Sequence, residues 1–274
     1  MARTAWQRGH RRLYHWQRFD PNDATKLDRF NQFLRTGRLH CSSPSAFNDP
    51  WDCRPHLNTD LLDDAHELQR HVEWAVDITS RLTPMPPDRI EAMRQRLAGD
   101  VPYAKELLTR MSVSIVEAIA AKQRVYCLGP DPTNTLMWSH YAEDHKGICL
   151  EYSLENDVMS CALECEYLAE FPQMRPYRES PDEHLRVLLA KSNVWGYENE
   201  FRLVVEERAL ATPGADVLLC DDSKLQLPQG ALLRVIVGCQ GPVEAVRHVV
   251  REAAPQVSVR RAVRVPNRYE LRIE

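Results

Sequence analysis

The sequence lacks several patterns that would assign its chemistry directly. It has no C-x-x-C pair, no G-x-S-x-G nucleophile turn and no glycine-rich phosphate loop. No hydrophobic run reaches the length of a membrane-spanning helix, and the N-terminal MARTAWQRGHRRLYHW has no apolar signal-peptide region. We therefore expect a soluble, cytoplasmic protein without a membrane partner.

A strong excess of one charge is also missing. The chain has 35 Lys and Arg against 39 Asp and Glu, a net charge of -4, which disfavours nucleic-acid binding by the whole surface but permits a local basic patch. Several of the eight cysteines lie in apolar runs such as VYCLG and GICLEY, where a thiol behaves as a small buried hydrophobe. We expect structural, reduced thiols and a reducing compartment, with disulfides or a metal site as the alternative.

The length and composition are those of a globular protein. With 274 residues, 43% of them hydrophobic and 27% charged, the chain is expected to form one domain over 1–274. Helical spacing dominates 58–122, where prolines and Gly99 separate successive amphipathic segments. We interpret 58–122 as a helical insertion that covers the rest of the fold.

The remaining sequence alternates strands and helices, which predicts the α+β class. An amphipathic helix over 23–37 follows a strand at LYHWQRF and ends at Gly37. Further strands are predicted at RLHCSS, RVYCLG, ICLEYSL, ALLRVIVGC, VSVRRAVRV and YELRIE. Further helices are predicted at TNTLMWSHYAEDHKG, DEHLRVLLAKSNVW and PVEAVRHVVREAAP.

The predicted helix over 136–146 carries a notable set of side chains. Trp138, Tyr141 and His145 stand at positions i, i+3 and i+7, so they would share one face. Such a face can stack a planar ring and offer a hydroxyl and an imidazole to a ligand. The alternative is that the two aromatic residues pack in the core while His145 lies at the negative end of the helix dipole.

Two other segments could contribute polar groups. In FNDPWD, Asn48 and Asp49 can close an Asx turn on their own backbone, or they can orient a ligand. His15 lies in the middle of the first strand, where a histidine is commonly a hydrogen-bonded core residue. It becomes a candidate site residue if other polar side chains lie close to it.

The segment NVWGYENEFRLVV, 193–205, is predicted to be a strand with Glu198, Glu200 and Arg202 on one face. Carboxylates at i and i+2 lie roughly 7 Å apart and oppose each other's ionisation when water is excluded. The pair is therefore either hydrated at the surface or functional. A carboxylate held in such a place can act as a base or stabilise a developing cation.

The order of three motifs carries a family resemblance. FNDPWD, LMWSHYAEDHKG and KSNVWGYENEFR, in that order, resemble a widespread bacterial family known as domain of unknown function 2971. The resemblance covers most of the chain outside the helical block. It implies no mechanism by itself.

A looser resemblance is to the ADP-ribosyltransferase fold of DNA-modifying toxins and poly(ADP-ribose) polymerases. LYHW is similar to the Tyr-His strand that opens that fold, and FLRTGRLHCS to its helix that ends in Gly before a strand. VYCLG, LMWSHYA and ICLEYS resemble its strand, Tyr-bearing helix and strand, and NEFRLVV its late strand opened by a glutamate. The resemblance implies a central mixed, split β-sheet with flanking helices.

The same resemblance implies NAD as a substrate and gives roles to the candidate residues. His15 would hold the nicotinamide ribose, and Tyr141 or Trp138 would stack near the nicotinamide ring. Glu200 would bind the ribose 2′-hydroxyl and stabilise the oxocarbenium-like transition state, while Glu198 would activate the acceptor. The NAD-binding set implied in this way is Tyr14, His15, Asn48, Asp49, Trp138, Tyr141 and His145.

Three functions follow as hypotheses. The leading one is a cytoplasmic NAD-dependent ADP-ribosyltransferase, a toxin, stress or phage-defence effector that modifies an unknown nucleic acid or protein. The second is a metal-assisted hydrolase built from Asp49, Asp52, His145, Glu198 and Glu200. The third is a noncatalytic binding module in which the same motifs are structural.

Overall fold

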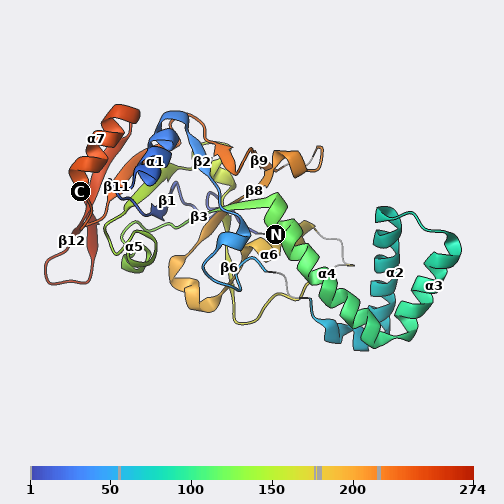
Figure 1. The fold of residues 1–274 in the computed structure, drawn as a ribbon. Coiled ribbons are helices and arrows are strands. Elements are labelled where there is room, and N and C mark those ends of the chain that lie inside the picture. The colour runs from blue at the N-terminus through green and yellow to red at the C-terminus, as the bar shows by residue number, and fades with distance from the viewer. Residues whose placement is uncertain (1, 55–56, 176, 178–180, 215–216) are drawn as a thin grey trace.

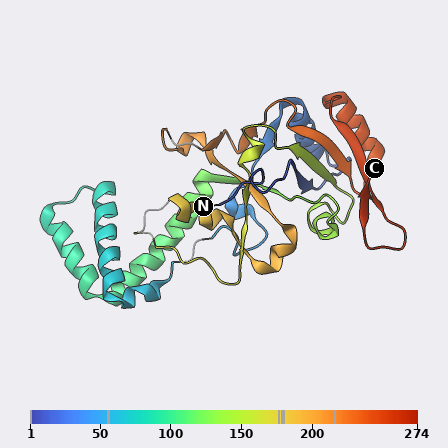
Figure 2. The same cartoon turned by 180° about the vertical axis from the view of Figure 1, so that it is seen from behind.

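The computed structural model describes residues 2–54, 57–175, 177, 181–214 and 217–274 (Figure 1). Two curled sheets with flanking helices form a mixed α+β body, and three helices extend from one side of it (Figures 1 and 2). The α+β class predicted from the alternation of strands and helices is confirmed.

The larger sheet has five strands in the order β1-β4-β11-β12-β13. β11 and β12 are parallel, and the other pairs are antiparallel. Helices α1 and α7 pack together over this sheet, and their apolar stripes form the main core with it (Figure 1). The elements are β1 (Arg12–Gln17), α1 (Ala24–Thr36), β4 (Ile148–Ser153), β11 (Leu232–Val237), α7 (Val243–Ala253), β12 (Ser258–Arg264) and β13 (Leu271–Ile273).

The second sheet is built around β8 (Phe201–Glu207), which has β3 along one edge and β5 and β9 along the other. Its strands are β3 (Gln123–Leu128), β5 (Leu163–Glu164) and β9 (Leu218–Cys220). Two further pairs flank the sheets: antiparallel β2 (Arg38–His40) with β10 (Lys224–Gln226), and parallel β6 (Glu166–Leu168) with β7 (Ala190–Ser192).

The two sheets meet where β1 approaches the end of β3. Tyr14 and Gly129 exchange both backbone hydrogen bonds at 2.8 Å, which links the sheets through one bridge. Deeper in the core, the hydroxyls of Tyr126 on β3 and Tyr152 on β4 lie 2.9 Å apart. Both side chains are buried, so these hydroxyls satisfy each other rather than water.

The block over 58–122 contains the three predicted helices, α2 (Ala65–Leu82), α3 (Pro87–Gly99) and α4 (Val101–Lys122). Their apolar faces form a separate core cluster around Val72, Leu97 and Leu108. The helices project away from the sheets, and α4 leads back into β3 (Figures 1 and 2). α2 and α3 therefore do not cover the sheets as expected, whereas α4 packs against β3, β8 and η1 (Pro44–Ala46).

Two predicted helices are shorter than expected. The helix expected over 136–146 is α5 (Thr135–Tyr141), because Glu143, Asp144 and His145 all have positive φ and cannot continue it. The helix expected to run to Trp195 is α6 (Pro181–Leu189), after which the chain enters β7.

The strand expected over 193–205 begins only at Phe201. Its first half forms the 3-10 helix η4 (Asn193–Glu198). Asn199 follows with φ 45°, a left-handed conformation that breaks the alternation of faces. The other 3-10 helices are η1 (Pro44–Ala46), η2 (Thr59–Asp63), η3 (Met159–Cys161) and η5 (Arg208–Leu210).

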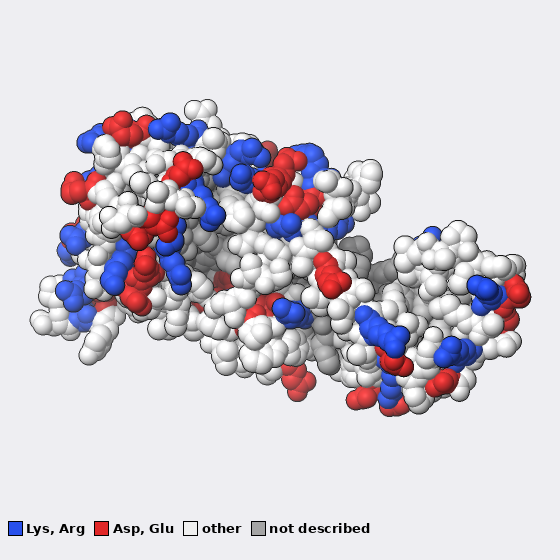
Figure 3. All heavy atoms as spheres, viewed as in Figure 1, with Lys and Arg blue, Asp and Glu red and all other residues white. Residues whose placement is uncertain are grey.

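None of the helices in the described part of the chain combines the length and apolar character needed to span a bilayer. On the face of the molecule seen in Figure 3, Lys and Arg side chains lie interspersed with Asp and Glu. That distribution agrees with the small net charge.

The Tyr126–Tyr152 pair makes a testable contribution to the junction of the sheets. Tyr152→Phe should lower the free energy of unfolding by about 1–3 kcal/mol, because it leaves the buried Tyr126 hydroxyl without a partner. The double variant Tyr126→Phe/Tyr152→Phe removes both groups and should be more stable than the single variant. Urea unfolding measures both, with the fully exposed Tyr269→Phe as a neutral control. Additive losses in the double variant would contradict the pairing.

Candidate functional site

Arg202, on β8, has no solvent exposure and holds two carboxylates. Its Nη1 and Nη2 donate to Oδ1 and Oδ2 of Asp52 at 2.8 and 2.6 Å. Its Nε and Nη2 donate to the two carboxylate oxygens of Glu200 at 2.8 and 3.1 Å. Nη1 also donates to the Leu188 carbonyl at 2.7 Å. Paired donors on two carboxylates are the strongest geometry available to a guanidinium, so this group is fixed in place.

Lys191, on β7, joins this pair to a third carboxylate. Its Nζ donates to Oε2 of Glu200 at 2.7 Å and to Oε2 of Glu198. Both glutamates and the lysine are buried. Asp52, Lys191, Glu198, Glu200 and Arg202 thus form one buried ion-paired network, hereafter the charge cluster. It contains three carboxylates and two cations.

The pKa values of the two glutamates in the cluster are shifted in opposite directions. Burial alone would raise the pKa of Glu200, but Arg202 and Lys191 hold it well below its usual range. Burial raises the pKa of Glu198 above its ordinary value, although Lys191 opposes this. Neighbouring carboxylates whose pKa values are pushed apart are typical of sites where one group moves a proton and the other stays charged.

Tyr141, the last residue of α5, contacts the carboxylate with the raised pKa. Its hydroxyl donates to Oε1 of Glu198 at 2.6 Å. Burial and the nearby Glu198 raise the pKa of Tyr141 well above its ordinary value, so the hydroxyl keeps its proton. Asn134 connects α5 to η4, because it caps α5 and donates through Nδ2 to the Tyr197 carbonyl at 2.8 Å.

Four rings lie together beside Glu198. His140, Tyr141, Trp195 and Tyr197 have ring centroids 6.1–6.4 Å apart in successive pairs, and all four are at least partly exposed. We call this group the aromatic surface. The Nζ of Lys191 lies 5.4 Å from the centroid of the Trp195 ring, which links the aromatic surface to the charge cluster. A planar ring of a ligand can stack there.

The FNDPWD segment fixes both parts of the site. Asp49 accepts from the Trp51 amide at 2.9 Å, which confirms the expected Asx turn, and it also accepts from the Trp195 indole at 2.7 Å. Asp52 binds Arg202. Asn48, expected in the NAD-binding set, is exposed and belongs to neither the charge cluster nor the aromatic surface.

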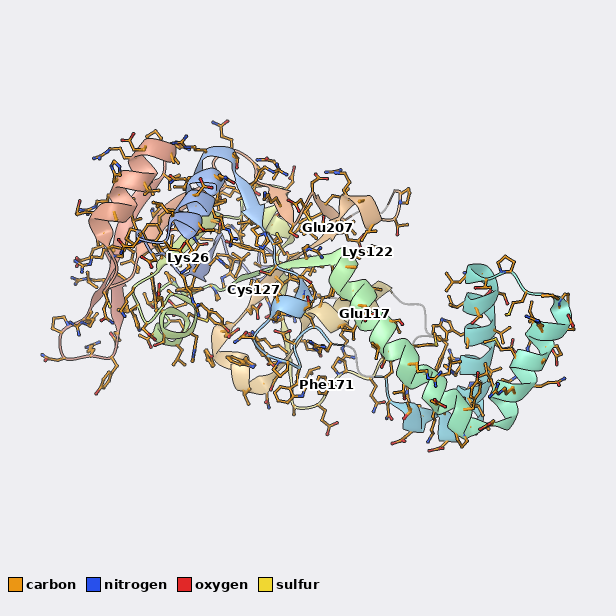
Figure 4. The ribbon with its side chains drawn as sticks, in the orientation of Figure 1. Lys26, Glu117, Lys122, Cys127, Phe171 and Glu207 are labelled. Atoms are coloured by element: carbon orange, nitrogen blue, oxygen red, sulfur yellow. The ribbon has the colours of Figure 1, made fainter. Side chains whose placement is uncertain are left out.

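His15 lies behind the site rather than in it. Its ring stacks on Tyr126 at 4.1 Å, and Nδ1 donates to the Cys127 carbonyl at 2.8 Å. The Cys127 thiol in turn contacts Glu200 (Figure 4 marks Cys127 within the body). Burial lowers the pKa of His15 to about 4, so the ring is neutral. Its neighbour Tyr14 takes part in the bridge between the sheets.

Trp138 and His145 do not extend the Tyr141 face as expected. Trp138 is fully buried, and its indole donates to the Pro132 carbonyl at 2.7 Å. His145 lies beyond the end of α5 and stacks on Trp138, with ring centroids 6.4 Å apart. The prediction that Trp138, Tyr141 and His145 share a ligand-binding helix face is wrong, because the helix ends at Tyr141.

The site residues missed by the sequence analysis are Lys191, His140, Trp195 and Tyr197. Lys191 was placed inside a predicted helix, where a lysine is ordinarily solvated. Trp195 and Tyr197 stand two positions apart in the predicted strand and would share a face with Asn199, away from Glu198, whereas η4 places both rings beside Glu198. The run of aromatic residues in NVWGY was the one available signal.

The described residues contain no group of three or more His, Cys, Asp and Glu side chains that could hold a metal ion. The metal-assisted hydrolase hypothesis therefore finds no ligand set among them. All eight cysteines are free thiols, most of them buried, as expected for structural cysteines.

Comparison of the chain with protein-family models, curated proteins and solved structures found no match.

The buried Arg202–Asp52 pair should contribute far more to stability than an exposed pair of the same type. Asp52→Ala leaves part of a buried guanidinium uncompensated and should cost about 3–5 kcal/mol of unfolding free energy. Asp221→Ala, which breaks the exposed Arg208–Asp221 pair, should cost about 0–1 kcal/mol. Urea unfolding measures both variants. Equal losses of unfolding free energy would contradict a larger contribution from the buried Arg202–Asp52 pair.

The opposed glutamates predict opposite effects of pH. As pH rises from about 3 to about 7, Glu200→Gln should lose stability relative to the wild type, because a carboxylate with a lowered pKa stabilises the fold above its unfolded pKa of about 4.3. Glu198→Gln should gain relative stability over the same range. In the wild type, Glu198 loses its proton at a lower pH in the unfolded chain than in the folded protein. Rising pH therefore favours the unfolded chain and lowers wild-type stability between the two pKa values.

This pH test compares slopes rather than absolute stabilities, since either substitution also removes contacts with Lys191. Unfolding free energies of the wild type and both variants are measured by urea at each pH. Glu244→Gln, at an exposed position on α7, should run parallel to the wild type. For each cluster variant, the difference in unfolding free energy from the wild type is plotted against pH. Slopes of the same sign for Glu198→Gln and Glu200→Gln would contradict the opposite pKa shifts assigned to the two glutamates.

Proposed function

We propose that this chain is an NAD-dependent ADP-ribosyltransferase that modifies a nucleic-acid or protein acceptor, and that it belongs to the domain of unknown function 2971 family. One observation carries the proposal. A buried carboxylate in excess of the cations of its cluster, Glu198, lies beside a surface of partly exposed rings.

The charge of the cluster supports a substrate that becomes cationic. Arg202 neutralises Asp52, and Lys191 is shared between Glu198 and Glu200, so two cations serve three carboxylates. With all five groups ionised the cluster carries one net negative charge. A fixed anion of this kind, held away from water, stabilises positive charge that develops next to it better than water does.

Cleavage of NAD generates such a charge. The bond between ribose C1′ and the nicotinamide nitrogen breaks, and its electron pair neutralises the nicotinamide ring. Positive charge develops on the ribose, and an acceptor nucleophile or water then bonds to C1′ and loses a proton. In the proposed site Glu198 stabilises the ribosyl cation and takes that proton, to which its raised pKa is suited.

The surrounding groups have supporting roles in this proposal. The aromatic surface offers a stacking face for the nicotinamide or adenine ring. Tyr141 orients Glu198 through a hydrogen bond, and Glu200 holds Lys191. His15 positions Cys127 and β3 behind Glu200, rather than binding the ribose directly.

These assignments change the roles implied by the family resemblance. The resemblance points to Glu200 as the transition-state carboxylate, but both of its oxygens are bound by Arg202 and Lys191. Glu198 binds one cation instead of two and contacts a partly exposed tyrosine. We therefore assign Glu198 the reacting role and Glu200 a positioning role.

The proposal is tested by incubating the purified chain with NAD and measuring nicotinamide release. Glu198→Gln keeps the size of the side chain but removes its charge, and it should reduce turnover by a factor of about 10²–10³. Glu244→Gln is the matched control on the exposed face of α7 and should retain wild-type turnover. Circular dichroism establishes that each variant is folded.

Because an acceptor is required in transfer, the assay is repeated with a lysate that contains nucleic acid and protein, and with radiolabelled NAD. Label incorporated into one fraction identifies the acceptor class. A folded wild-type protein that releases no nicotinamide in either assay would overturn the proposal in favour of a noncatalytic binding module. Turnover unchanged in Glu198→Gln would overturn the assigned role of Glu198.

A further inference from the structure

A cavity of about 210 Å³ lies next to the charge cluster, and its lining residues include none of the aromatic surface. It is formed by the FNDPWD segment, the loop after β6 and the end of α6 with β7, and Lys191 is one of its lining residues. Drug-sized ligands occupy pockets of about 300–1,000 Å³, whereas a cavity of about 150 Å³ can hold benzene. The size therefore suits a ligand with one substituted ring and excludes a whole dinucleotide.

The walls of the cavity suit a planar ring. Trp51 and Phe171 both line it, although they are 120 positions apart in the sequence. Their side chains stay 63% and 43% exposed, which is unusual for large aromatic residues. Figure 4 shows Phe171 on the loop below the sheets. A flat ligand between such groups would remove apolar surface from water.

The charges of the lining select the substituent. Arg54 and Lys191 provide two cations, and Glu170 provides one carboxylate. Lys191 is already bound to the glutamates of the charge cluster, so Arg54 is the cation placed to receive a ligand. Its side chain is exposed, and no ion pair of Arg54 occurs among the residues that the structure describes. Glu170 disfavours a second negative charge on the ligand.

We propose that this cavity binds a small planar aromatic monocarboxylate, of the size class of benzoate or nicotinate. Trp51 and Phe171 hold the ring, and the Arg54 guanidinium binds the carboxylate, a geometry that arginine favours. The site is distinct from the aromatic surface beside Glu198, and the proposal does not rest on NAD cleavage. Lys191 belongs to the charge cluster and also lines the cavity, so a ligand bound there would lie next to the cluster.

Isothermal titration calorimetry of the full chain tests the proposal, with benzoate and nicotinate as probes. Uncharged benzamide and non-aromatic cyclohexanecarboxylate serve as comparison ligands. Benzoate should bind with a Kd on the order of 0.1–1 mM, a range consistent with a ligand of nine non-hydrogen atoms. Benzamide, which lacks the charge, and cyclohexanecarboxylate, which lacks the flat ring, should each bind more weakly.

Two variants separate the roles of charge and ring. Arg54→Gln should weaken benzoate binding about 10-fold or more and leave benzamide unchanged. Phe171→Ala should weaken both ligands. Arg208→Gln, a substitution of the same type at an exposed arginine paired with Asp221, should change neither.

Three outcomes would overturn the proposal. The first is no heat of binding from the wild type up to about 10 mM benzoate. The second is equal affinity of the wild type and Arg54→Gln for benzoate. The third is benzoate binding that Phe171→Ala leaves unchanged, which would place the anion elsewhere. Because no step of this test requires NAD, it fails or succeeds independently of the nicotinamide assay.

Discussion

The guanidinium of Arg202 is the constraint on which the rest of the site depends. A buried cation costs several kcal/mol unless its donors are paired, and Arg202 meets that cost with Asp52, Glu200 and a backbone carbonyl. These partners come from the FNDPWD loop, the entry to β8 and the end of α6. One group therefore holds together three segments that are far apart in the sequence. Once they are fixed, Lys191 and Glu198 have few alternative positions.

The same constraint positions part of the aromatic surface. Asp49 and Asp52 belong to one turn, so the contact of Asp52 with Arg202 also positions Asp49 against the Trp195 indole. From the other side, Asn134 ties α5 to η4, which sets Tyr141 against Glu198. Trp195 and Tyr141 are thus held by the buried carboxylates of Asp49 and Glu198 in addition to packing. Rings held in this way would lose little conformational entropy on stacking against a ligand.

Local patterns predicted the elements well where local forces decide. The helices of 58–122 and the strands at LYHWQ and ICLEYS follow from periodicity alone. The pattern at 193–205 failed because alternation could not reveal that Asn199 adopts a left-handed conformation. Lys191 was missed for a related reason. Helix spacing extends α6 through this residue, but Lys191 lies in β7 paired with β6, and its Nζ binds Glu198 and Glu200, so tertiary contacts decide its position.

The sequence did single out the two glutamates, but for a reason that the structure revises. They were expected to share a strand face, where mutual repulsion would make them unusual. Instead η4 and the turn at Asn199 give them different surroundings: Glu200 faces two cations, and Glu198 faces one cation and a tyrosine hydroxyl. That asymmetry separates their pKa values in a way that strand spacing could not.

Separating the two carboxylates matters for any reaction that creates and then discharges a cation. A carboxylate that stabilises the cation and then takes a proton must be free to change its protonation, while a neighbour that stays charged keeps the surrounding groups in place. If both glutamates were equally paired, neither would be free to change its protonation. If neither were paired, repulsion would keep one protonated or expel both to water. By fixing Glu200, Arg202 leaves Glu198 as the group whose charge can respond to a substrate.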